Sequence, residues 1–323
     1  MRKVLVTGVA GFIASKVAEF LLADGVEVVG IDNLNSYYDV RLKNWRLEQL
    51  QGQKIFHFEK IDIEDQSALK QLFDQHQFDV VFNLAARAGV RYSMENPHVY
   101  MSTNAQGSLN LLEEMRRTGV KKFILASTSS LYAGLAMPFS EELPVNAPIS
   151  PYAASKKAAE VMAYTYHYLY GIDVSIVRYF TVFGPASRPD MAIFRFIEWI
   201  DRGEKIQLFG DGAQSRDFTY VDDIARGTIL AAKPLGYEVI NLGGGRNPIS
   251  VSRVIEGMEK GLSKKAVVDV LDSNKSDMKQ TWADIAKAQR LLGWKPEVDF
   301  EMGLERTIEW HRKNTAWLQE VSL

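Results

Sequence analysis

Short apolar runs alternate with longer segments of helical period over the first 180 residues of the chain. The runs are rich in Val and Ile, and they lie at 3–7, 27–31, 78–84, 122–127 and 173–178. Strands that are apolar along their length are covered on both faces, and helices between them connect parallel neighbours. The pattern predicts an α/β fold with a doubly wound parallel sheet.

The pattern changes after residue 180. Segments punctuated by Pro and Gly, such as 184–189 and 210–212, replace the regular alternation. Farther on, a helical segment near 221–232 and a strand-like segment at 239–242 are regular enough to rejoin the sheet. We therefore expect a first domain over 1–180, with elements near 221–243 returning to it. The smaller second lobe would be formed mainly by 181–323, interleaved with the first domain.

The composition narrows the classes of partner. With 323 residues, of which 46% are hydrophobic, the chain can bury a full core. The formal net charge is only -2 and the basic residues are dispersed, which does not favour binding to nucleic acid. There is no cysteine, no leader pattern at the start, and no run near the roughly 20 apolar residues of a membrane span. We expect a cytoplasmic protein with no membrane partner and no metal site.

A loop with two glycines follows the first predicted strand. Gly8 and Gly11 permit a tight turn and a close approach of the backbone to a pyrophosphate, whose charge lies at the N-terminus of the next helix. Ala14 occupies the position of the usual third glycine, and alanine also permits close packing of helix on strand. The loop predicts a dinucleotide site.

An acidic residue ends the second predicted strand. Asp32 follows the loop by about 20 residues, where a carboxylate binds a ribose 2′-hydroxyl and repels a 2′-phosphate. This position favours NAD over NADP. The alternative is that Asp32, together with Asn33, caps a turn or helix.

A tyrosine and a lysine four residues apart form a second group of candidates. Tyr152 and Lys156 share one face of a helix that should start at Ser150, so the ammonium would favour ionisation of the phenol. A phenol whose pKa is brought down from about 10 can act as a general base. The hydroxyl cluster 127–130 ends the fourth predicted strand and can reach the same substrate alcohol. An ordinary surface pair is the alternative.

Several blocks of sequence follow one another in order, namely 8–13, 32–39, 84–93, 179–185, 188–191 and 216–223. Together they carry a resemblance to the extended short-chain dehydrogenase/reductase family. Within it, the chain is most similar to nucleotide-sugar 4-epimerases, especially UDP-glucuronate 4-epimerases. The resemblance covers nearly the whole chain and implies a Rossmann-type sheet.

The resemblance implies a site for NAD and a catalytic triad of Thr128, Tyr152 and Lys156. Thr128 would bridge the 4-hydroxyl of the sugar to Tyr152, and Tyr152 and Lys156 would also hold the nicotinamide ribose. The residues expected to bind NAD are Gly8, Gly11, Phe12, Ile13, Asp32, Asn33, Asp62, Ile63, Leu84, Ala86, Asn104, Tyr152, Lys156 and Tyr179.

The resemblance also implies a site for a UDP-sugar. Arginines suit its phosphates by charge and fork geometry, although a structural ion pair is the alternative for each of them. Leu208 and Phe209 lie in the segment similar to the one that holds uracil, and plain core is equally open for them. The residues expected to face the substrate are Arg91, Ser129, Ser130, Thr181, Arg188, Gln207, Arg216 and Asp277.

Two serines distinguish this sequence from other members of the family. Dehydratases carry an Asp-Glu pair directly after the catalytic Thr, and decarboxylases usually carry a Glu two residues after it; here the positions are Ser129 and Ser130. Elimination of water needs a further acid and base. The resemblance thus implies an isomerase that converts UDP-glucuronate to UDP-galacturonate through a 4-keto intermediate.

Other activities stay open at this point. They are a UDP-glucose or UDP-N-acetylglucosamine 4-epimerase, a UDP-glucuronate decarboxylase, and a non-catalytic regulator that binds NAD. Family members usually form a homodimer, and the resemblance implies that the helices near 104–118 and 152–170 would build its interface.

Overall fold

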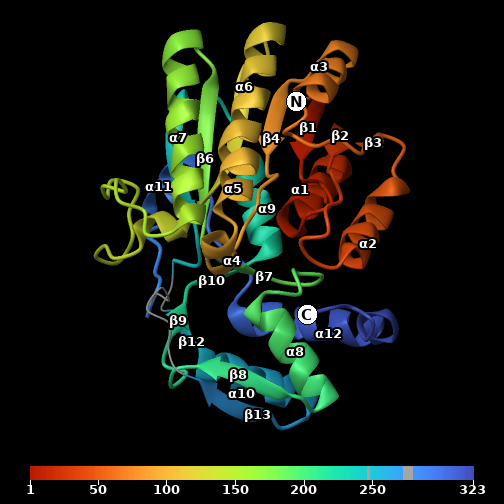
Figure 1. Cartoon of the computed structure of the whole chain (residues 1–323), viewed down its shortest axis with the longest axis vertical. Coiled ribbons are helices and arrows are strands. Elements are labelled where there is room, and N and C mark those ends of the chain that lie inside the picture. Colours follow the sequence, from red (N-terminus) through yellow and green to blue (C-terminus); the bar gives the residue numbers. More distant parts are fainter. Residues whose placement is uncertain (246–247, 272–278) are drawn as a thin grey trace.

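A central sheet of seven parallel strands organises the structure, a computed structural model that describes residues 1–245, 248–271 and 279–323 (Figure 1). The strand order is β11-β6-β5-β4-β1-β2-β3, so the order reverses on either side of β1. The strands are β1 (Lys3–Thr7), β2 (Glu27–Ile31), β3 (Phe56–Glu59), β4 (Val80–Asn83), β5 (Lys122–Thr128), β6 (Asp173–Tyr179) and β11 (Tyr237–Leu242). The predicted α/β fold with a doubly wound parallel sheet is confirmed.

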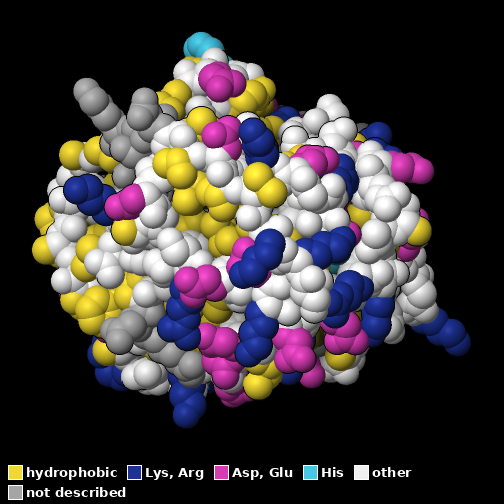
Figure 2. Space-filling view, turned by 90° about the horizontal axis from the view of Figure 1, so that it is seen from below, with side chains coloured by type: hydrophobic (Ala, Val, Ile, Leu, Met, Phe, Trp, Pro, Cys, Tyr) yellow, Lys and Arg dark blue, Asp and Glu magenta, His cyan; other side chains and the backbone are white. Residues whose placement is uncertain are grey.

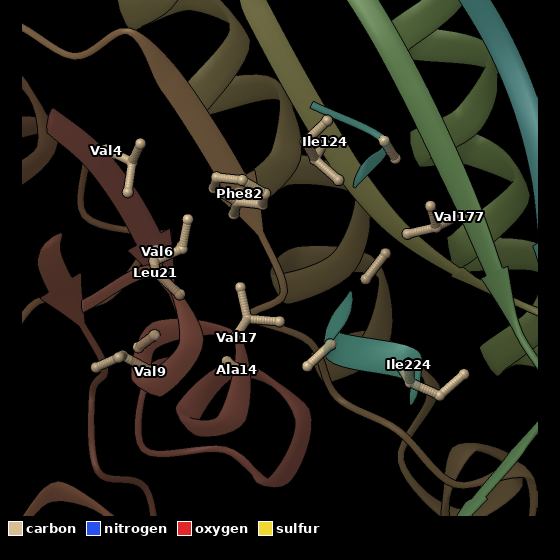
Figure 3. Close-up of a cluster of buried hydrophobic side chains, with 14 of the residues drawn as sticks. Val4, Val6, Val9, Ala14, Val17, Leu21, Phe82, Ile124, Val177 and Ile224 are labelled. Carbon is tan, nitrogen blue, oxygen red and sulfur yellow. The ribbon is translucent and has the colours of Figure 1, made fainter. Parts of the chain in front are cut away.

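Helices cover both faces of the sheet, as the apolar strands require. One face is covered by α1 (Phe12–Ala23), α2 (Val40–Gln51), α9 (Val221–Leu230) and α11 (Ala286–Leu292). The other is covered by α3 (Gln66–Gln75), α6 (Gly107–Thr118) and α7 (Pro151–Tyr170). Val4 and Val6 point into the first layer, and Leu5 between them points into the second. Figure 3 shows Val4, Val6 and Leu21 in the first layer with Phe82 and Ile124 of the neighbouring strands.

A second lobe lies beyond the carboxyl ends of the strands (Figure 1). Its helices are α8 (Ala192–Arg202), α10 (Val251–Leu262) and α12 (Phe300–Leu318). Its strand pairs are β8 (Lys205–Phe209) with β13 (Val267–Leu271), β9 (Ser215–Arg216) with β12 (Ile249–Ser250), and β7 (Thr181–Phe183) with β10 (Phe218–Tyr220). The lobe has its own apolar core, in which Ile197, Met258 and Ile308 come from its three helices.

The chain returns to the sheet after entering the second lobe. Helix α9 packs against α1, and β11 pairs in parallel with β6 at the edge of the sheet. The helical and strand-like segments expected near 221–232 and 239–242 correspond to these two elements. The strand β3 was not expected, because its sequence Phe56-His57-Phe58-Glu59 mixes polar and apolar residues at a partly exposed edge.

The surface of the second lobe carries charges of both signs. In the view from below, basic and acidic side chains are interspersed rather than gathered by sign (Figure 2). Within the described residues, every helix is too short or too polar to cross a bilayer.

We predict that the layer in Figure 3 supports the stability of the fold. Ile124→Ala removes a fully buried side chain and should lower the free energy of unfolding by about 2–5 kcal/mol. Ile149→Ala, at a position that is 59% exposed, is the matched control and should change it by less than about 0.5 kcal/mol. Urea unfolding followed by circular dichroism measures both. Equal losses in the two variants would contradict the assignment of this layer as the core.

Candidate active site

The loop between β1 and α1 requires glycine at two positions. Gly8 has a φ of 67°, and a Cβ atom built on it would lie 2.7 Å from the Cα atom of Ala85. A Cβ atom on Gly11 would lie 2.8 Å from the carbonyl oxygen of Gly8. Helix α1 starts at Phe12 with Ile13 in its first turn, and within the described chain no side chain caps this end. Its backbone N–H groups therefore suit an anion such as a pyrophosphate.

Asp32 lies at the end of β2 beside a buried lysine. Its Oδ1 atom accepts a hydrogen bond from the N–H of Leu34 at 2.8 Å. Asp32 therefore caps a turn, which was the alternative role considered for it from the sequence. The same oxygen lies 3.5 Å from Nζ of Lys43 on α2. Burial lowers the pKa of Lys43, and the charge of Asp32 acts against that shift. Lys43 was not predicted from the sequence. The feature that could have indicated it is its place beside Leu42 on the buried side of α2.

Asn104 holds the segment after β4 against α7. Its Oδ1 atom accepts the N–H of Arg87 at 2.8 Å, and its Nδ2 atom donates to the carbonyl of Arg87 at 3.0 Å. Nδ2 also lies 2.9 Å from Oγ of Ser155 on α7. The segment that these bonds fix contains Leu84 and Ala86, so three of the expected NAD-binding residues lie together.

Three more of the residues expected to bind NAD lie near the ends of β2 and β3, and a fourth, Tyr179, lies deeper in the protein. Asn33 donates its Nδ2 hydrogen to Oδ2 of Asp62 at 2.7 Å, which joins the segments after the two strands. Ile63 is buried in the layer on the α6 side. The hydroxyl of Tyr179 lies 2.8 Å from Oγ1 of Thr228 on α9. Tyr179 thus has a buried partner within the protein.

Helix α7 starts where the sequence predicts. Ser150 accepts the N–H of Ala153 at 3.2 Å, and Pro151 occupies the first helical position, where its missing N–H costs no hydrogen bond. This start places Tyr152 in the first turn and Lys156 one turn later on the same side.

The side chains of Tyr152 and Lys156 both contact the end of β5. Tyr152 is hydrogen-bonded to the side chain of Thr128, the last residue of the strand. Lys156 donates its Nζ hydrogen to the carbonyl of Ala126 at 3.0 Å. The oxygen of Thr128 also accepts the N–H of Ser130 at 3.1 Å. The structure therefore brings together all three residues expected to form the catalytic triad.

Burial dominates the electrostatics of this group. It raises the pKa of Tyr152, while the hydrogen bond from Thr128 and the positive charge of Arg188 act in the opposite direction. Burial lowers the pKa of Lys156 to about 8, and the charge of Glu160 opposes that shift. The expectation that the Tyr152 pKa is lowered is wrong for the polypeptide itself, because desolvation of the phenolate outweighs the favourable charges.

Arg188 reaches from the second lobe to the site. It forms a two-armed ion pair with Asp190, with Nε to Oδ1 at 2.9 Å and Nη2 to Oδ2 at 2.5 Å. Its guanidinium lies 5.7 Å from the ring centre of Tyr37, whose hydroxyl donates to the carbonyl of Ala88 at 2.7 Å. The ring of Tyr37 also lies 5.4 Å from the guanidinium of Arg87. Arg188 therefore forms a structural ion pair, which was the alternative role considered for it from the sequence. Its positive charge also acts against the rise in the pKa of Tyr152.

Hydroxyl groups gather at the carboxyl ends of β5 and β6. Ser129 and Ser130 start a short 3-10 turn that ends at Tyr132 and follows Thr128 directly. Thr181 opens β7 just beyond β6, which is paired with β5. The three hydroxyls expected to face the substrate thus follow neighbouring strands at one edge of the sheet.

The β8 segment contacts the first domain through one aromatic ring. The guanidinium of Arg91 on α4 (Val90–Glu95) lies 4.3 Å from the ring centre of Phe209. Leu208 is buried in the core of the second lobe, which is the packing role left open from the sequence. Gln207, between two buried neighbours along β8, is exposed.

Arg216 lies on β9 beside a buried carboxylate. Its Nη1 atom donates to the carbonyl of Ser215 at 2.9 Å. The next residue, Asp217, accepts the N–H groups of Ala283 at 2.8 Å and Gly245 at 3.2 Å. Burial raises the pKa of Asp217 to about 6, and these backbone hydrogen bonds oppose the shift. Asp277, the remaining expected substrate residue, lies outside the described residues.

Comparison with known proteins identifies the family. A family model described as GDP-mannose 4,6 dehydratase matches residues 5–307. This chain belongs to that family. It is an extended short-chain dehydrogenase/reductase family, in agreement with the resemblance found in the sequence.

Members of the family that are similar to this chain include epimerases. A UDP-glucuronate 4-epimerase from Thermodesulfobacterium geofontis is 57% identical over 319 residues, which cover 99% of each chain. A crystal structure of UDP-glucuronic acid 4-epimerase from Bacillus cereus in complex with UDP-glucuronic acid and NAD is 39% identical, with a TM-score of 0.90 over 96% of this chain and 99% of that one. A UDP-glucose 4-epimerase from Thermotoga maritima with UDP-glucose is 35% identical, with a TM-score of 0.87 over 97% and 99%.

We predict that Gly8 cannot carry a side chain. Gly8→Ala should lower the free energy of unfolding by about 1 kcal/mol or more and weaken dinucleotide binding, because of the positive φ and the contact with Ala85. Gly52→Ala is the control, since Gly52 has a φ of -71° and open space around it. Urea unfolding and titration with NAD measure the two effects. A Gly8→Ala variant that matched Gly52→Ala in both would refute the role of the loop.

Proposed function

We propose that this chain is an NAD-dependent UDP-glucuronate 4-epimerase, which interconverts UDP-glucuronate and UDP-galacturonate through a transient 4-keto sugar. The observation that carries the proposal is the group of Thr128, Tyr152 and Lys156, followed by the hydroxyls of Ser129 and Ser130. The 57% identity to a UDP-glucuronate 4-epimerase over nearly the full length of both chains supports the same substrate.

The residues around β1 and β2 fit NAD. A Cβ atom at Gly8 or Gly11 would collide with neighbouring backbone, so both glycines keep the tight turn that lets the start of α1 approach a pyrophosphate. Asp32 lies at the end of β2, where it would meet a ribose hydroxyl. The neighbouring candidates Asn33, Asp62 and Asn104 line the same edge of the sheet. When bound, NAD supplies the acceptor for a hydride from C4 of the sugar and returns that hydride later.

Tyr152 is the proton acceptor in the proposed reaction. Its phenolate takes the proton of the sugar 4-hydroxyl. If the sugar hydroxyl lies nearer to Thr128 than to Tyr152, the proton passes through the hydroxyl of Thr128, which is hydrogen-bonded to Tyr152. Thr128 and Arg188 stabilise the phenolate against the effect of burial, and Lys156 is proposed to hold the nicotinamide ribose. After the 4-keto sugar has turned over, it would accept the hydride on the opposite face of C4, and Tyr152 returns the proton to the 4-oxygen. The configuration at C4 is then inverted.

The substrate carboxylate needs restraint in this reaction. The 4-keto form of a uronic acid is a β-keto acid, which can lose carbon dioxide. Ser129, Ser130 and Thr181 offer hydroxyl donors to the carboxylate, and none of them repels it as a glutamate would. Arg188 is a fourth candidate, since its guanidinium reaches the same region from the second lobe. We propose that these groups hold the carboxylate in a geometry unsuited to cleavage.

The remaining substrate candidates would bind the nucleotide part. Arg91, Gln207, Arg216 and Asp277 are proposed to face the UDP group. In this division, residues 1–180 with the elements near 221–243 hold NAD, and residues 181–323 mainly hold the sugar nucleotide.

An apolar stripe on α7 supports a homodimer. Val161, Tyr164 and Tyr168 follow the spacing of one helical face, and they are 53%, 49% and 76% exposed. We propose that a second copy covers this stripe through α6 and α7, and that the dimer acts in the cytoplasm.

A UDP-glucose 4-epimerase is the second candidate, because a relative with that activity matches 97% of the chain with a TM-score of 0.87. Incubating the purified protein with UDP-glucuronate, UDP-glucose and UDP-N-acetylglucosamine and separating the products decides between them. We expect UDP-galacturonate to form fastest, with little carbon dioxide. Turnover of UDP-glucose without action on UDP-glucuronate would overturn the proposed substrate, and dominant release of carbon dioxide would indicate a decarboxylase.

We predict that Tyr152→Phe lowers turnover by a factor of about 10² to 10⁴, the usual effect of losing a general base, while UDP-sugar binding persists. Tyr170→Phe, at the end of the same helix, 43% exposed and outside the stripe of Val161, Tyr164 and Tyr168, is the control and should keep the wild-type rate. Single-turnover kinetics and calorimetric binding separate the two effects. If the Tyr152 variant retained its rate, the proton acceptor would have to be another group.

We predict that Arg188→Ala slows epimerisation and raises the fraction of UDP-4-keto-pentose, because the 4-keto acid is then held loosely. Nuclear magnetic resonance of both nucleotide products during turnover gives the ratio. Arg253→Ala, which breaks an exposed ion pair with Glu301 on the second lobe, should leave the ratio unchanged. An unchanged ratio in Arg188→Ala would overturn the role of Arg188 and leave the substrate assignment intact.

A further inference from the structure

A buried carboxylate lies one helical turn beyond Lys156 on α7. Glu160 is 2% exposed, and its Oε1 atom accepts hydrogen bonds from Oγ of Ser127 at 2.7 Å and Nε of Arg178 at 2.9 Å. Its Oε2 atom accepts from Nη2 of Arg178 at 2.7 Å. A carboxylate held by both arms of a guanidinium and by a hydroxyl has a fixed position.

The partners of Glu160 lie directly behind the catalytic hydroxyls. Ser127 precedes Thr128 on β5, and Arg178 is its register partner on β6. Arg178 also donates its Nη1 hydrogen to the hydroxyl of Tyr132 at 2.8 Å. Tyr132 ends the turn that begins with Ser129, and its hydroxyl donates in turn to Oδ1 of Asn241 on β11 at 2.8 Å. The hydrogen-bonded group around Glu160 therefore connects β5, β6, β11 and α7 at the level of the site.

The charged and titratable groups around Glu160 come from each of these elements. They are Lys156 and Lys157 on α7, Arg178 on β6, Tyr132 in the turn after β5 and Tyr237 on β11. Arg178 forms the close ion pair, and Nζ of Lys157 lies 3.8 Å from Oε2. Lys156 donates its hydrogen bond to the carbonyl of Ala126. Glu160 acts on Lys156 through the electrostatic effect of its negative charge.

We infer that Glu160 is a positioning residue for the proposed reaction. Its carboxylate holds the end of β5, which carries Thr128, against α7, which carries Tyr152 and Lys156. Its negative charge also favours the protonated form of Lys156. The inference rests on the proposed function and assigns to this reaction a residue that need not touch the substrate. Burial disfavours the ammonium of Lys156, and the charge of Glu160 offsets part of that effect.

The test is the pH dependence of turnover in the NAD-loaded enzyme carrying Glu160→Gln. Loss of one negative charge makes the proton of Lys156, one helical turn away, easier to lose, so Lys156 should titrate at lower pH. We expect the alkaline limb of the pH–rate profile, at which Lys156 loses its proton, to move down by about one unit or more, which is the size expected for one charge at the spacing of an i,i+4 pair in a partly buried site. The acid limb, set by Tyr152 two helical turns from Glu160, should stay in place. A residue with a structural role alone would lower the rate and leave the limbs in place.

Two variants separate charge from packing. Glu160→Asp keeps the charge and shortens the side chain, so the rate should fall while the limbs stay where they are in the wild type. Ser127→Ala removes one hydrogen bond from the same carboxylate, and its limbs should also stay in place. A limb shift in either variant comparable to that of Glu160→Gln would overturn the assignment of the charge to Glu160.

The Gln variant leaves Arg178 buried without its counter-charge, which can prevent folding. The double variant Glu160→Leu with Arg178→Met removes both charges and keeps the volume. Its alkaline limb should move to lower pH by less than in Glu160→Gln, because Glu160 lies nearer to Lys156 and the loss of the Arg178 charge acts in the opposite direction. The ionisation of Lys156, followed in the nuclear magnetic resonance spectrum of lysine-labelled protein against Lys156→Arg, gives the same shift without turnover. Unshifted titration in the variants would overturn the inference. Failure of the wild type to act on UDP-glucuronate would instead contradict the proposed function, and the spectrum would still test Glu160.

Discussion

Burial of the Tyr152 phenol is the physical constraint around which the site is arranged. A phenolate removed from water is unfavourable, so the group that takes a proton from the substrate needs compensating interactions. The structure supplies a hydrogen bond from Thr128 and the positive charge of Arg188. Lys156 has the opposite problem, because burial favours loss of its proton, and the charge of Glu160 acts against that loss. The catalytic pair is therefore balanced by groups from both lobes.

The two lobes meet through long polar side chains and through a small apolar cluster in which Leu42 of α2 packs with Phe194 and Leu318 of the second lobe. Arg46 on α2 donates to the carbonyl of Ala10 in the glycine loop at 2.9 Å and to the carbonyl of Ala186, at the entry to the second lobe, at 2.8 Å. Arg188 packs from that entry onto the ring of Tyr37. These polar links and the shared apolar cluster together hold the substrate side against the dinucleotide side.

Much of the fold could be predicted from the sequence because its signals are local. The apolar runs gave the main strands, and Ser150 with Pro151 gave the start of α7 through its cap. The loop with Gly8 was predictable because only glycine suits its φ of 67°. The edge strand β3 was missed because a partly exposed strand mixes polar and apolar residues.

The electrostatics of the site could not be predicted in the same way. The roles of Lys43 and Glu160 depend on partners distant in sequence or on other elements, namely Asp32 for Lys43 and Arg178 for Glu160. The spacing of Tyr152 and Lys156 showed that they share a helical face, but it did not give the degree of burial, which reverses the expected direction of the Tyr152 pKa shift.

The central claim is that the hydrogen at C4 leaves the sugar as a hydride and returns to the same carbon from the bound NAD. UDP-glucuronate labelled with deuterium at C4 tests it directly, with the product analysed by nuclear magnetic resonance and mass spectrometry. The account predicts UDP-galacturonate that retains deuterium at C4, a slower rate for the labelled substrate, and no incorporation from solvent. Loss of the label to water, or solvent deuterium at C4 when the unlabelled substrate reacts in heavy water, would contradict the account.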